Sequence, residues 1–264
     1  IRKPFDSVTV RSRVRNIVEL FMYKNQLEDK VRIQTENLKR QNRLLEQQAE
    51  KIKASNEKII DVLGTVVEYR NLESGEHIKR VKGFTRILAE KAAKKYPEYN
   101  LTPERINIIV AASALHDIGK ITIKDSVLLK PGRLDKDEFE YMKSHTVRGC
   151  DILDQIDGAW DSEYAKVSYA ICRHHHERYD GKGYPDGLAG EEIPIEAQLV
   201  SVADVYDALV SERVYKEAID KDKAYHMILM GECGVFSPKL MECFRESKEE
   251  FENLALKYEN AKKE

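Results

Sequence analysis

The sequence predicts an all-α fold in which a long helix precedes a helical domain. Hydrophobic residues recur at helical spacing in almost every segment, and no segment alternates between polar and apolar residues as a half-buried strand does. Neither proline nor glycine interrupts residues 24–60, which is typical of a single long helix. The chain has 264 residues, of which 42% are hydrophobic and 34% are charged. This is enough for one sizeable core and an additional helix outside it.

Residues 1–22 are interpreted as the end of a preceding domain. Lys3-Pro4-Phe5 and the amphipathic stretch after it resemble the last strand and helix of response-regulator receiver domains. On this interpretation, the phosphate-accepting aspartate lies in a part of the receiver that the sequence does not include, and an upstream histidine kinase would be a partner. An ordinary helix with a basic face is the alternative.

Residues 23–60 predict a coiled coil, because apolar residues recur every seven positions and are followed three residues later by polar ones. The apolar positions are Val31, Leu38, Leu45, Ile52 and Ile59, and the polar positions are Gln34, Gln41, Gln48 and Ser55. Such a seam is weak but fixes the register, so we expect a parallel homodimer whose helix transmits a signal. A single solvated helix is the alternative. The apolar stripe continues into the next domain through Val62, Val66 and Tyr69.

Residues 61–264 are predicted to form the globular domain, and local signals mark where its helices begin. Thr102 and Pro103 have the residue types of an N-cap and a first helical position. Asp135 and Glu138 have the spacing of a capping box. A later helix carries its apolar stripe at Ile195, Leu199, Val202 and Tyr206.

The distribution of histidines and carboxylates indicates a metal site. His116 and Asp117 end an apolar helix, and Asp204 interrupts another. Burying such groups costs free energy unless a positive charge compensates, as a divalent metal does. Imidazole and carboxylate together suit iron, manganese, zinc or nickel. Each group alone has an ordinary alternative, namely a satisfied core histidine, a helix cap or an ion-pair partner. His226 stands apart and is expected at the surface.

Five segments in this order resemble the HD-GYP domain, a group of bacterial cyclic di-GMP phosphodiesterases within the HD superfamily of metal phosphohydrolases. The segments are HDIGK at 116–120, KPGRL at 130–134, HTVRG at 145–149, HHERYDGKGYP at 175–185 and ADVYDAL at 203–209. The resemblance covers residues from about 61 to 250. It implies an HD-superfamily helical bundle that hydrolyses cyclic di-GMP to pGpG, GMP or both, as the output domain of a two-component response regulator.

The resemblance also implies a set of metal ligands. They are His77, His116, Asp117, His145, His175, His176 and Asp204. Glu73 lies one helical turn before His77, and relatives with glutamate there resemble those that hold three metals instead of two. A solvated acid is the alternative for Glu73. We therefore expect two or three divalent transition-metal ions, with iron or manganese preferred and nickel or zinc as alternatives. His174 precedes the motif and is expected to support the site from outside or to be exposed.

Hydrolysis of a phosphodiester needs an activated water and neutralisation of the phosphate, which two metals bridged by Asp117 can supply. Lys120, three residues later, is expected near the scissile phosphate, where it would stabilise charge or protonate the leaving group. The alternative for Lys120 is a charge that satisfies a helix C-terminus. The glycine-rich loop can approach a ligand closely and is expected to bind substrate through Gly183, Tyr184 and Pro185, and the resemblance assigns the same role to Arg213 and Lys216.

Composition argues against several other classes of protein. The net charge of −2 favours neither nucleic-acid polymers nor an anionic membrane, and no apolar run is long enough to span a bilayer. The four cysteines form no CxxC pair and indicate reduced thiols, so we expect a cytoplasmic protein. The complete ligand set favours an enzyme. The alternatives are a catalytically weak cyclic-dinucleotide sensor, a protein-docking module, or a phosphohydrolase for another cyclic dinucleotide.

Overall fold

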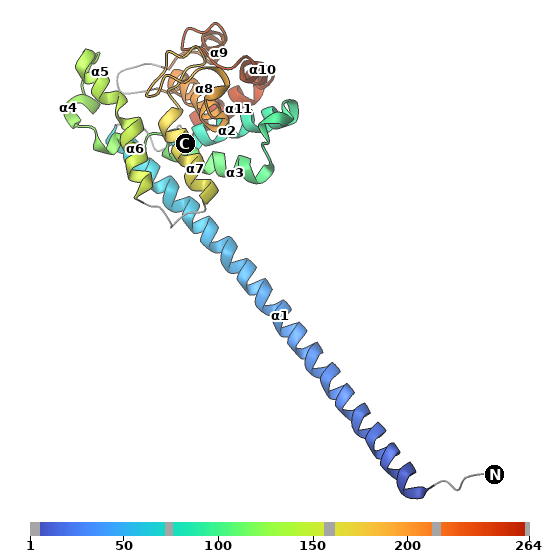
Figure 1. Ribbon diagram of the computed structural model, residues 1–264. Coiled ribbons are helices and arrows are strands. Elements are labelled where there is room, and N and C mark those ends of the chain that lie inside the picture. Colours follow the sequence, from blue (N-terminus) through green and yellow to red (C-terminus); the bar gives the residue numbers. More distant parts are fainter. Residues whose placement is uncertain (1–5, 72–75, 156–161, 213–217, 262–264) are drawn as a thin grey trace. The chain divides into compact units, whose positions relative to one another are not determined.

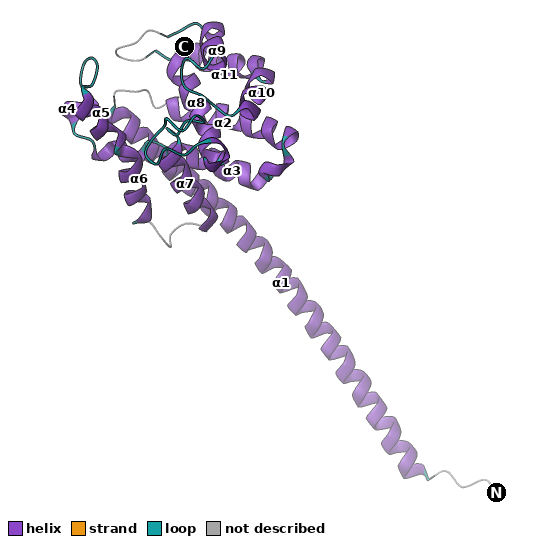
Figure 2. Cartoon of the chain, turned by 45° about the horizontal axis from the view of Figure 1, so that its top comes forward, coloured by secondary structure: helices purple, strands orange, loops and turns teal. Residues whose placement is uncertain are grey.

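The computed structural model describes residues 6–71, 76–155, 162–212 and 218–261 (Figure 1). Within these ranges every regular element is a helix and none is a strand, as Figure 2 shows. Asp180 and Ala189 form one isolated antiparallel bridge. The predicted all-α class is confirmed. The chain divides into two compact units, residues 1–56 and residues 57–264.

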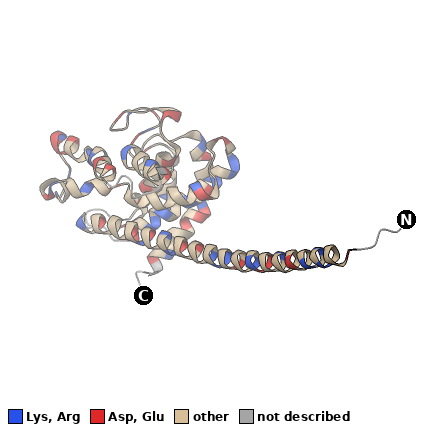
Figure 3. Cartoon of the chain, turned by 60° about the horizontal axis from the view of Figure 1, so that its bottom comes forward, with Lys and Arg blue, Asp and Glu red and all other residues tan. Residues whose placement is uncertain are grey.

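Helix α1 runs from Ser7 to Arg70 without interruption. The long helix predicted for residues 23–60 is therefore present and begins earlier than the heptad pattern indicates. Basic and acidic residues are interspersed along it (Figure 3). The apolar heptad residues are more than half exposed, so burial within a single chain does not explain them; they are Val31, Leu38, Leu45, Ile52 and Ile59. No helix in the described ranges is both long and apolar enough to cross a membrane.

The unit of residues 57–264 contains the end of α1 and a series of shorter helices. The α-helices are α2 (Glu76–Lys95), α3 (Pro103–Ala112), α4 (Asp125–Leu128), α5 (Lys136–Lys143), α6 (His145–Asp154), α7 (Ser162–His174), α8 (Ile195–Val210), α9 (Lys221–Leu229), α10 (Pro238–Glu246) and α11 (Lys248–Ala261). The 3₁₀ helices are η1 (Pro97–Tyr99), η2 (Ser113–Leu115), η3 (Ile118–Thr122) and η4 (Gly190–Glu192). Thr102 caps α3, and Asp135 with Glu138 forms a capping box on α5, as predicted.

The main core forms where α2 packs against α8, α10 and α11. Phe84 stacks on Phe251 with ring centroids 4.8 Å apart and meets Tyr206 edge-on at 5.0 Å. These three rings and Phe244 are fully buried. Burial of such a ring stabilises the unit by about 1.5–3 kcal/mol. The apolar stripe predicted on α8 lies in this core.

A second hydrophobic cluster joins the last turns of α1 to α2, η2, α6 and α7. Its buried residues from α1 are Ile60 and Val67. Gly64 lies between them, and a Cβ there would approach the carbonyl oxygen of Ala114 to 2.4 Å, so this close contact requires glycine. Cys172 from α7 is also in this cluster, and all four cysteines are free thiols. The second cluster therefore fixes the end of α1 next to the segment that carries His116 and Asp117.

Candidate metal centre

The seven predicted ligands converge from separate elements of the domain. His77 lies on α2, His116 and Asp117 lie between η2 and η3, His145 begins α6, His175 and His176 follow α7, and Asp204 lies in α8. Two groups have ligand atoms within 4.8 Å of one another: Asp117, His145, His175 and His176 in the first, and His77, His116 and Asp204 in the second. Glu73 lies outside the described residues. His226 is exposed, as expected.

Asp117 lies between the two groups and faces each with a different oxygen. Its Oδ1 is 3.2 Å from Nε2 of His145 and 3.7 Å from Nε2 of His175. Its Oδ2 is 3.2 Å from Nε2 of His116. The second group is completed by Asp204, whose Oδ1 lies 3.8 Å from Nε2 of His116. This is the arrangement that a carboxylate needs in order to bridge two cations.

In three of the histidines, one ring nitrogen forms a hydrogen bond with a backbone carbonyl group, and the other has no hydrogen-bond partner among the described residues. Their Nδ1–H groups donate to carbonyl oxygens: His116 to Ser113 at 2.8 Å, His145 to Met142 at 2.8 Å and His175 to Ile171 at 3.0 Å. The three Nε2 atoms and Oδ1 of Asp117 are buried and have no hydrogen-bond partner among the described residues. Buried lone pairs without partners are costly, and a metal ion satisfies them. The residues present therefore fit a metal.

The electrostatics of the two groups also fit a cation. Burial lowers the pKa of His175 and His176, so both rings are neutral and keep a lone pair available. Burial also lowers the pKa of His116, but the charges of Asp117 and Asp204 outweigh it and raise the pKa to about 10. The carboxylates of the second group thus favour a positive charge between them.

Asp207 and Arg80 orient His77, and neither was predicted from the sequence. Oδ2 of Asp207 is 2.7 Å from Nδ1 of His77, and Arg80 donates to the same carboxylate from Nε at 2.5 Å and from Nη2 at 3.0 Å. Burial raises the pKa of Asp207, but these hydrogen bonds outweigh it and lower the pKa to about 2. Helical spacing contained a signal, because Asp207 follows Asp204 by three residues and Arg80 follows His77 by three.

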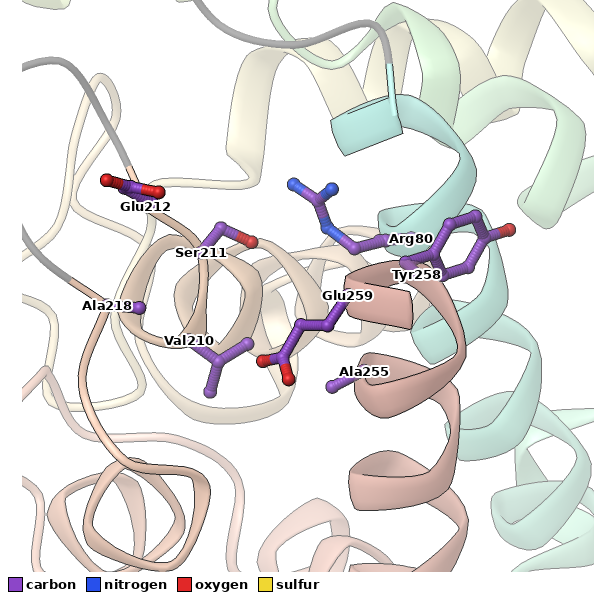
Figure 4. A pocket seen from close by; sticks show the side chains of 8 residues that line it. All are labelled: Arg80, Val210, Ser211, Glu212, Ala218, Ala255, Tyr258 and Glu259. Carbon is purple, nitrogen blue, oxygen red and sulfur yellow. The ribbon is translucent and has the colours of Figure 1, made fainter. Parts of the chain in front are cut away.

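Arg80 also borders a cavity of about 360 Å³ (Figure 4). The other lining residues are Val210, Ser211, Glu212, Ala218, Ala255, Tyr258 and Glu259. Arg213 and Lys216, which were predicted to bind substrate, fall in the sequence between two of these lining residues. Both lie outside the described residues.

Lys120 lies beside Asp117, at the oxygen that also faces His116 of the second group. Its Nζ is 2.5 Å from Oδ2 of Asp117, and its side chain is largely buried. Burial raises the pKa of Asp117, but the charges of Lys120 and His116 hold it well below its usual range. The ammonium group of Lys120 therefore pairs with the residue that lies between the two groups, at the oxygen that faces the second group.

The glycine-rich loop places Tyr184 on His176. The two rings stack with centroids 4.8 Å apart, and the backbone N–H of Tyr184 donates to the carbonyl oxygen of His176. A Cβ on Gly183 would come within 2.4 Å of the backbone of Glu177, so only glycine allows the loop to fold back this closely. Pro185 follows Tyr184 through a cis peptide bond. The three loop residues predicted to bind substrate thus lie beside a predicted ligand.

His174 supports this loop from outside and is not exposed. Its Nε2 is 3.0 Å from Oδ2 of Asp186, which also accepts from Nε of Arg173 at 2.7 Å. Glu177 accepts the backbone N–H groups of Asp186 and Gly187 at 2.7 and 3.0 Å. His174, the first histidine of the run, therefore anchors the turn after Pro185 through Asp186.

Comparisons with known proteins identify relatives of this chain. Residues 23–232 match the sequence profile of a family described as HD domain. A cyclic di-GMP phosphodiesterase of Vibrio cholerae is 39% identical over 220 residues, which are 82% of this chain and 44% of that protein. The cyclic di-GMP phosphodiesterase response regulator RpfG of Xanthomonas campestris is 34% identical over 263 residues, which are 98% of this chain and 64% of that protein. The chain spans less than two thirds of either relative.

Among solved structures, a cyclic GMP-AMP-specific phosphodiesterase of V. cholerae resembles the chain with a TM-score of 0.51. The alignment covers 73% of this chain and 48% of the other at 17% identity. At this identity the likeness concerns the fold alone, and it agrees with the helical architecture.

Proposed function

The chain belongs to the HD domain family, and from this premise we propose that it is a metal-dependent phosphodiesterase that hydrolyses cyclic di-GMP. The observation that carries the proposal is Asp117, whose two oxygens face two groups of ligand atoms that include buried Nε2 atoms without hydrogen-bond partners among the described residues. The names of the V. cholerae and X. campestris relatives support the substrate class.

The proposed ligand sets follow the two groups. Asp117, His145, His175 and His176 would hold one ion, and His77, His116 and Asp204 would hold another, with Asp117 shared. Glu73 would serve a third ion. Imidazole and carboxylate donors without thiolate suit iron, manganese, nickel and zinc, and of these we propose iron or manganese. When bound, the ions would lower the pKa of water and neutralise charge on the phosphate.

The side chains around the metal centre have separate roles in the proposal. Lys120, beside Oδ2 of Asp117, would bind the phosphate and supply a proton to the departing oxygen. Tyr184, held against His176 by the glycine-rich loop, would contact the nucleotide with Gly183 and Pro185. Arg213 and Lys216 would contact substrate from the segment outside the described residues.

The proposal extends to the place of this chain in a signalling protein. Residues 1–22 would be the end of a receiver domain, residues 23–60 a coiled-coil linker and residues 61–264 the catalytic domain. The response regulator of X. campestris aligns with 98% of the chain, which supports this arrangement and an upstream histidine kinase as partner. The free cysteines support a cytoplasmic location.

A parallel homodimer through α1 is part of the proposal. The partner that covers the apolar stripe of α1 would be a second copy of the chain, because the stripe has the seven-residue repeat of a coiled-coil seam. The stripe stays exposed as it continues on the last turns of α1, at Val62, Val66 and Tyr69. A second helix in register would cover it along its length.

Product analysis tests the proposed reaction. The chain is purified without oxygen, loaded with Fe(II) or Mn(II), and given cyclic di-GMP or 3′,3′-cyclic GMP-AMP in parallel. We expect pGpG, GMP or both from cyclic di-GMP, at a higher kcat/KM than for the hybrid dinucleotide. Binding of cyclic di-GMP without turnover would make the chain a sensor, and preference for the hybrid would correct the substrate.

A further inference from the structure

We infer that Arg70, in the last turn of α1, is a positioning residue that holds the segment carrying Lys120 in place for the reaction. The inference deepens the proposed function and rests on it, because it assigns a role at the same metal centre. Its basis is a set of hydrogen bonds that the sequence motifs do not include.

The guanidinium group of Arg70 binds four acceptors on one short stretch of chain. Nη1 donates to the carbonyl oxygens of Lys120 at 3.0 Å and Ile121 at 2.5 Å. Nη2 donates to the carbonyl oxygen of Ile123 at 2.7 Å and to Oδ1 of Asp125 at 2.7 Å. One side chain from α1 therefore ties down the backbone of Lys120 itself and the residues that follow it.

This stretch has a physical need for such a partner. Lys120 lies in η3, a 3₁₀ helix of five residues, and the last carbonyl groups of a short helix have few partners within it. Arginine offers five N–H donors in a rigid plane, so it can serve several carbonyl groups at once. Lysine has a single ammonium group and cannot span the same set of acceptors.

The same stretch also packs closely against α6. A Cβ on Gly119 would lie 1.9 Å from the carbonyl oxygen of His145 and 2.6 Å from the backbone nitrogen of Gly149. The segment of Lys120 is thus held both by α6 and by Arg70. Without Arg70 only one of these supports remains, and Nζ of Lys120 would no longer be held 2.5 Å from Asp117.

Arg70 can act as a support because its own helix is anchored. Ile60 and Val67 are buried in the second hydrophobic cluster, and Gly64 brings α1 into close contact with Ala114. A small rotation of these last turns would therefore move Arg70 and, through its hydrogen bonds, the backbone of Lys120. A movement of the end of α1 would in this way change the position of Lys120.

Substitution of Arg70 tests the inference. In Arg70→Gln we expect kcat to fall by about ten- to a hundredfold, because small displacements of a reacting group are costly. KM and metal content should stay within about twofold of the wild-type values, since no proposed ligand is changed. Arg70→Lys should recover part of the loss. The matched control is Arg86→Gln, which removes an exposed arginine that donates to Asn107 on the surface of the same domain.

A double-mutant cycle with Lys120 separates positioning from general damage. If Arg70 acts through Lys120, Arg70→Gln should lower the rate of Lys120→Ala by no more than about twofold. Full additivity of the two losses would overturn the inference.

A second readout does not depend on turnover. Hydrogen exchange of the backbone amides in residues 118–125, measured by mass spectrometry, should be faster in Arg70→Gln and unchanged in Arg86→Gln. Unchanged exchange together with unchanged kcat would overturn the inference. The rates are also measured with bis(p-nitrophenyl) phosphate. If the wild-type chain cleaves only this compound, the proposed substrate is wrong while the role of Arg70 is still decided by its variants.

Discussion

In the proposed metal centre the backbone orients His116, His145 and His175, because each donates from Nδ1 to a carbonyl oxygen a turn away. This leaves Nε2 of each ring as a buried acceptor that faces Asp117 or its neighbours. The carbonyl partner sets the tautomer, and the tautomer sets which atom can bind an ion. Asp117 is the residue on which both groups depend.

Asp117→Asn is expected to lose metal from both groups. The amide nitrogen cannot bind an ion, so one of the two oxygens that face the groups is lost together with the negative charge. Asp204→Asn should affect the second group alone, because its carboxylate faces His77 and His116. Metal content per purified chain, measured by mass spectrometry, checks both expectations.

The control for this pair is Asp222→Asn, which changes an exposed aspartate that pairs with Lys248. It should bind as much metal as the wild type. A full complement of metal in Asp117→Asn would contradict the role of Asp117 as a shared ligand.

Asp207→Asn is expected to lower both stability and metal affinity. Arg80 would lose the carboxylate that it binds most closely and keep only Glu76 at 3.8 Å, and loss of one member of a buried ion pair costs about 3–5 kcal/mol. His77 would lose the acceptor that orients its ring, which typically weakens metal binding by about 10–100-fold. Denaturant unfolding and metal titration measure the two effects. Wild-type values in both would show that the contact of Asp207 with His77 has no influence on the site.

The motifs predicted the seven residues that the structure brings together in the two groups, because HDIGK and HHERYDGKGYP are long and specific. They did not identify Asp207 or Arg80 as partners of His77. That contact joins residues 130 positions apart and exists only after α2 and α8 have packed together. The role of Arg70 was not predicted for the same reason, since its acceptors lie 50 or more positions later in the chain.

The helices were predictable where the signal is local. The cap at Thr102 and the capping box at Asp135 depend on neighbours within a turn, and both are present. A helix after Phe5 was predicted, but its continuation into the long helix without a break was not, because the heptad repeat marks only the part with an apolar stripe. The approach of η3 to α6 was not predictable either, since it depends on a glycine whose neighbour lies on another element.

Gly119→Ala tests this close approach between elements. The new Cβ would meet backbone atoms of His145 and Gly149, which cannot rotate away, so we expect a loss of about 1–3 kcal/mol or more in the free energy of unfolding. In the control, Gly83→Ala, the new Cβ meets the end of the Leu254 side chain, which can rotate. Denaturant unfolding should show little loss for the control. Equal losses in both would mean that the contact of η3 with α6 is not tight.

The coiled-coil seam of α1 is tested by charges placed within it. Leu38→Lys with Leu45→Lys should weaken the dimer, because burial of an unpaired charge costs several kcal/mol. The domain should stay folded, since residues 57–264 contain both hydrophobic clusters. Light scattering at micromolar concentration measures the mass. The control, Glu36→Lys with Gln47→Lys, places two lysines away from the seam and should remain dimeric. A monomeric wild-type chain would remove the coiled-coil proposal.

At the scale of the whole molecule, one unit carries the chemistry and the other carries an exposed stripe. The unit of residues 57–264 holds every described candidate ligand, and residues 1–56 are described as helix from Ser7 onward. Helix α1 belongs to both units, and its last turn supplies Arg70 to the backbone of Lys120. A rotation of the proposed dimer seam could therefore reach Lys120 through the continuous helix α1 and the hydrogen bonds of Arg70.

The most direct test of the account is the rate of cyclic di-GMP hydrolysis before and after metal removal. The chain is stripped by a chelator without oxygen, assayed, and then titrated with Fe(II) or Mn(II). If the chain is a metal-dependent phosphodiesterase, the stripped chain should show no turnover, and recovery should saturate at two or three ions per chain. Turnover that persists in the stripped chain, or that no metal restores, would contradict the assignment of a metal-dependent phosphodiesterase.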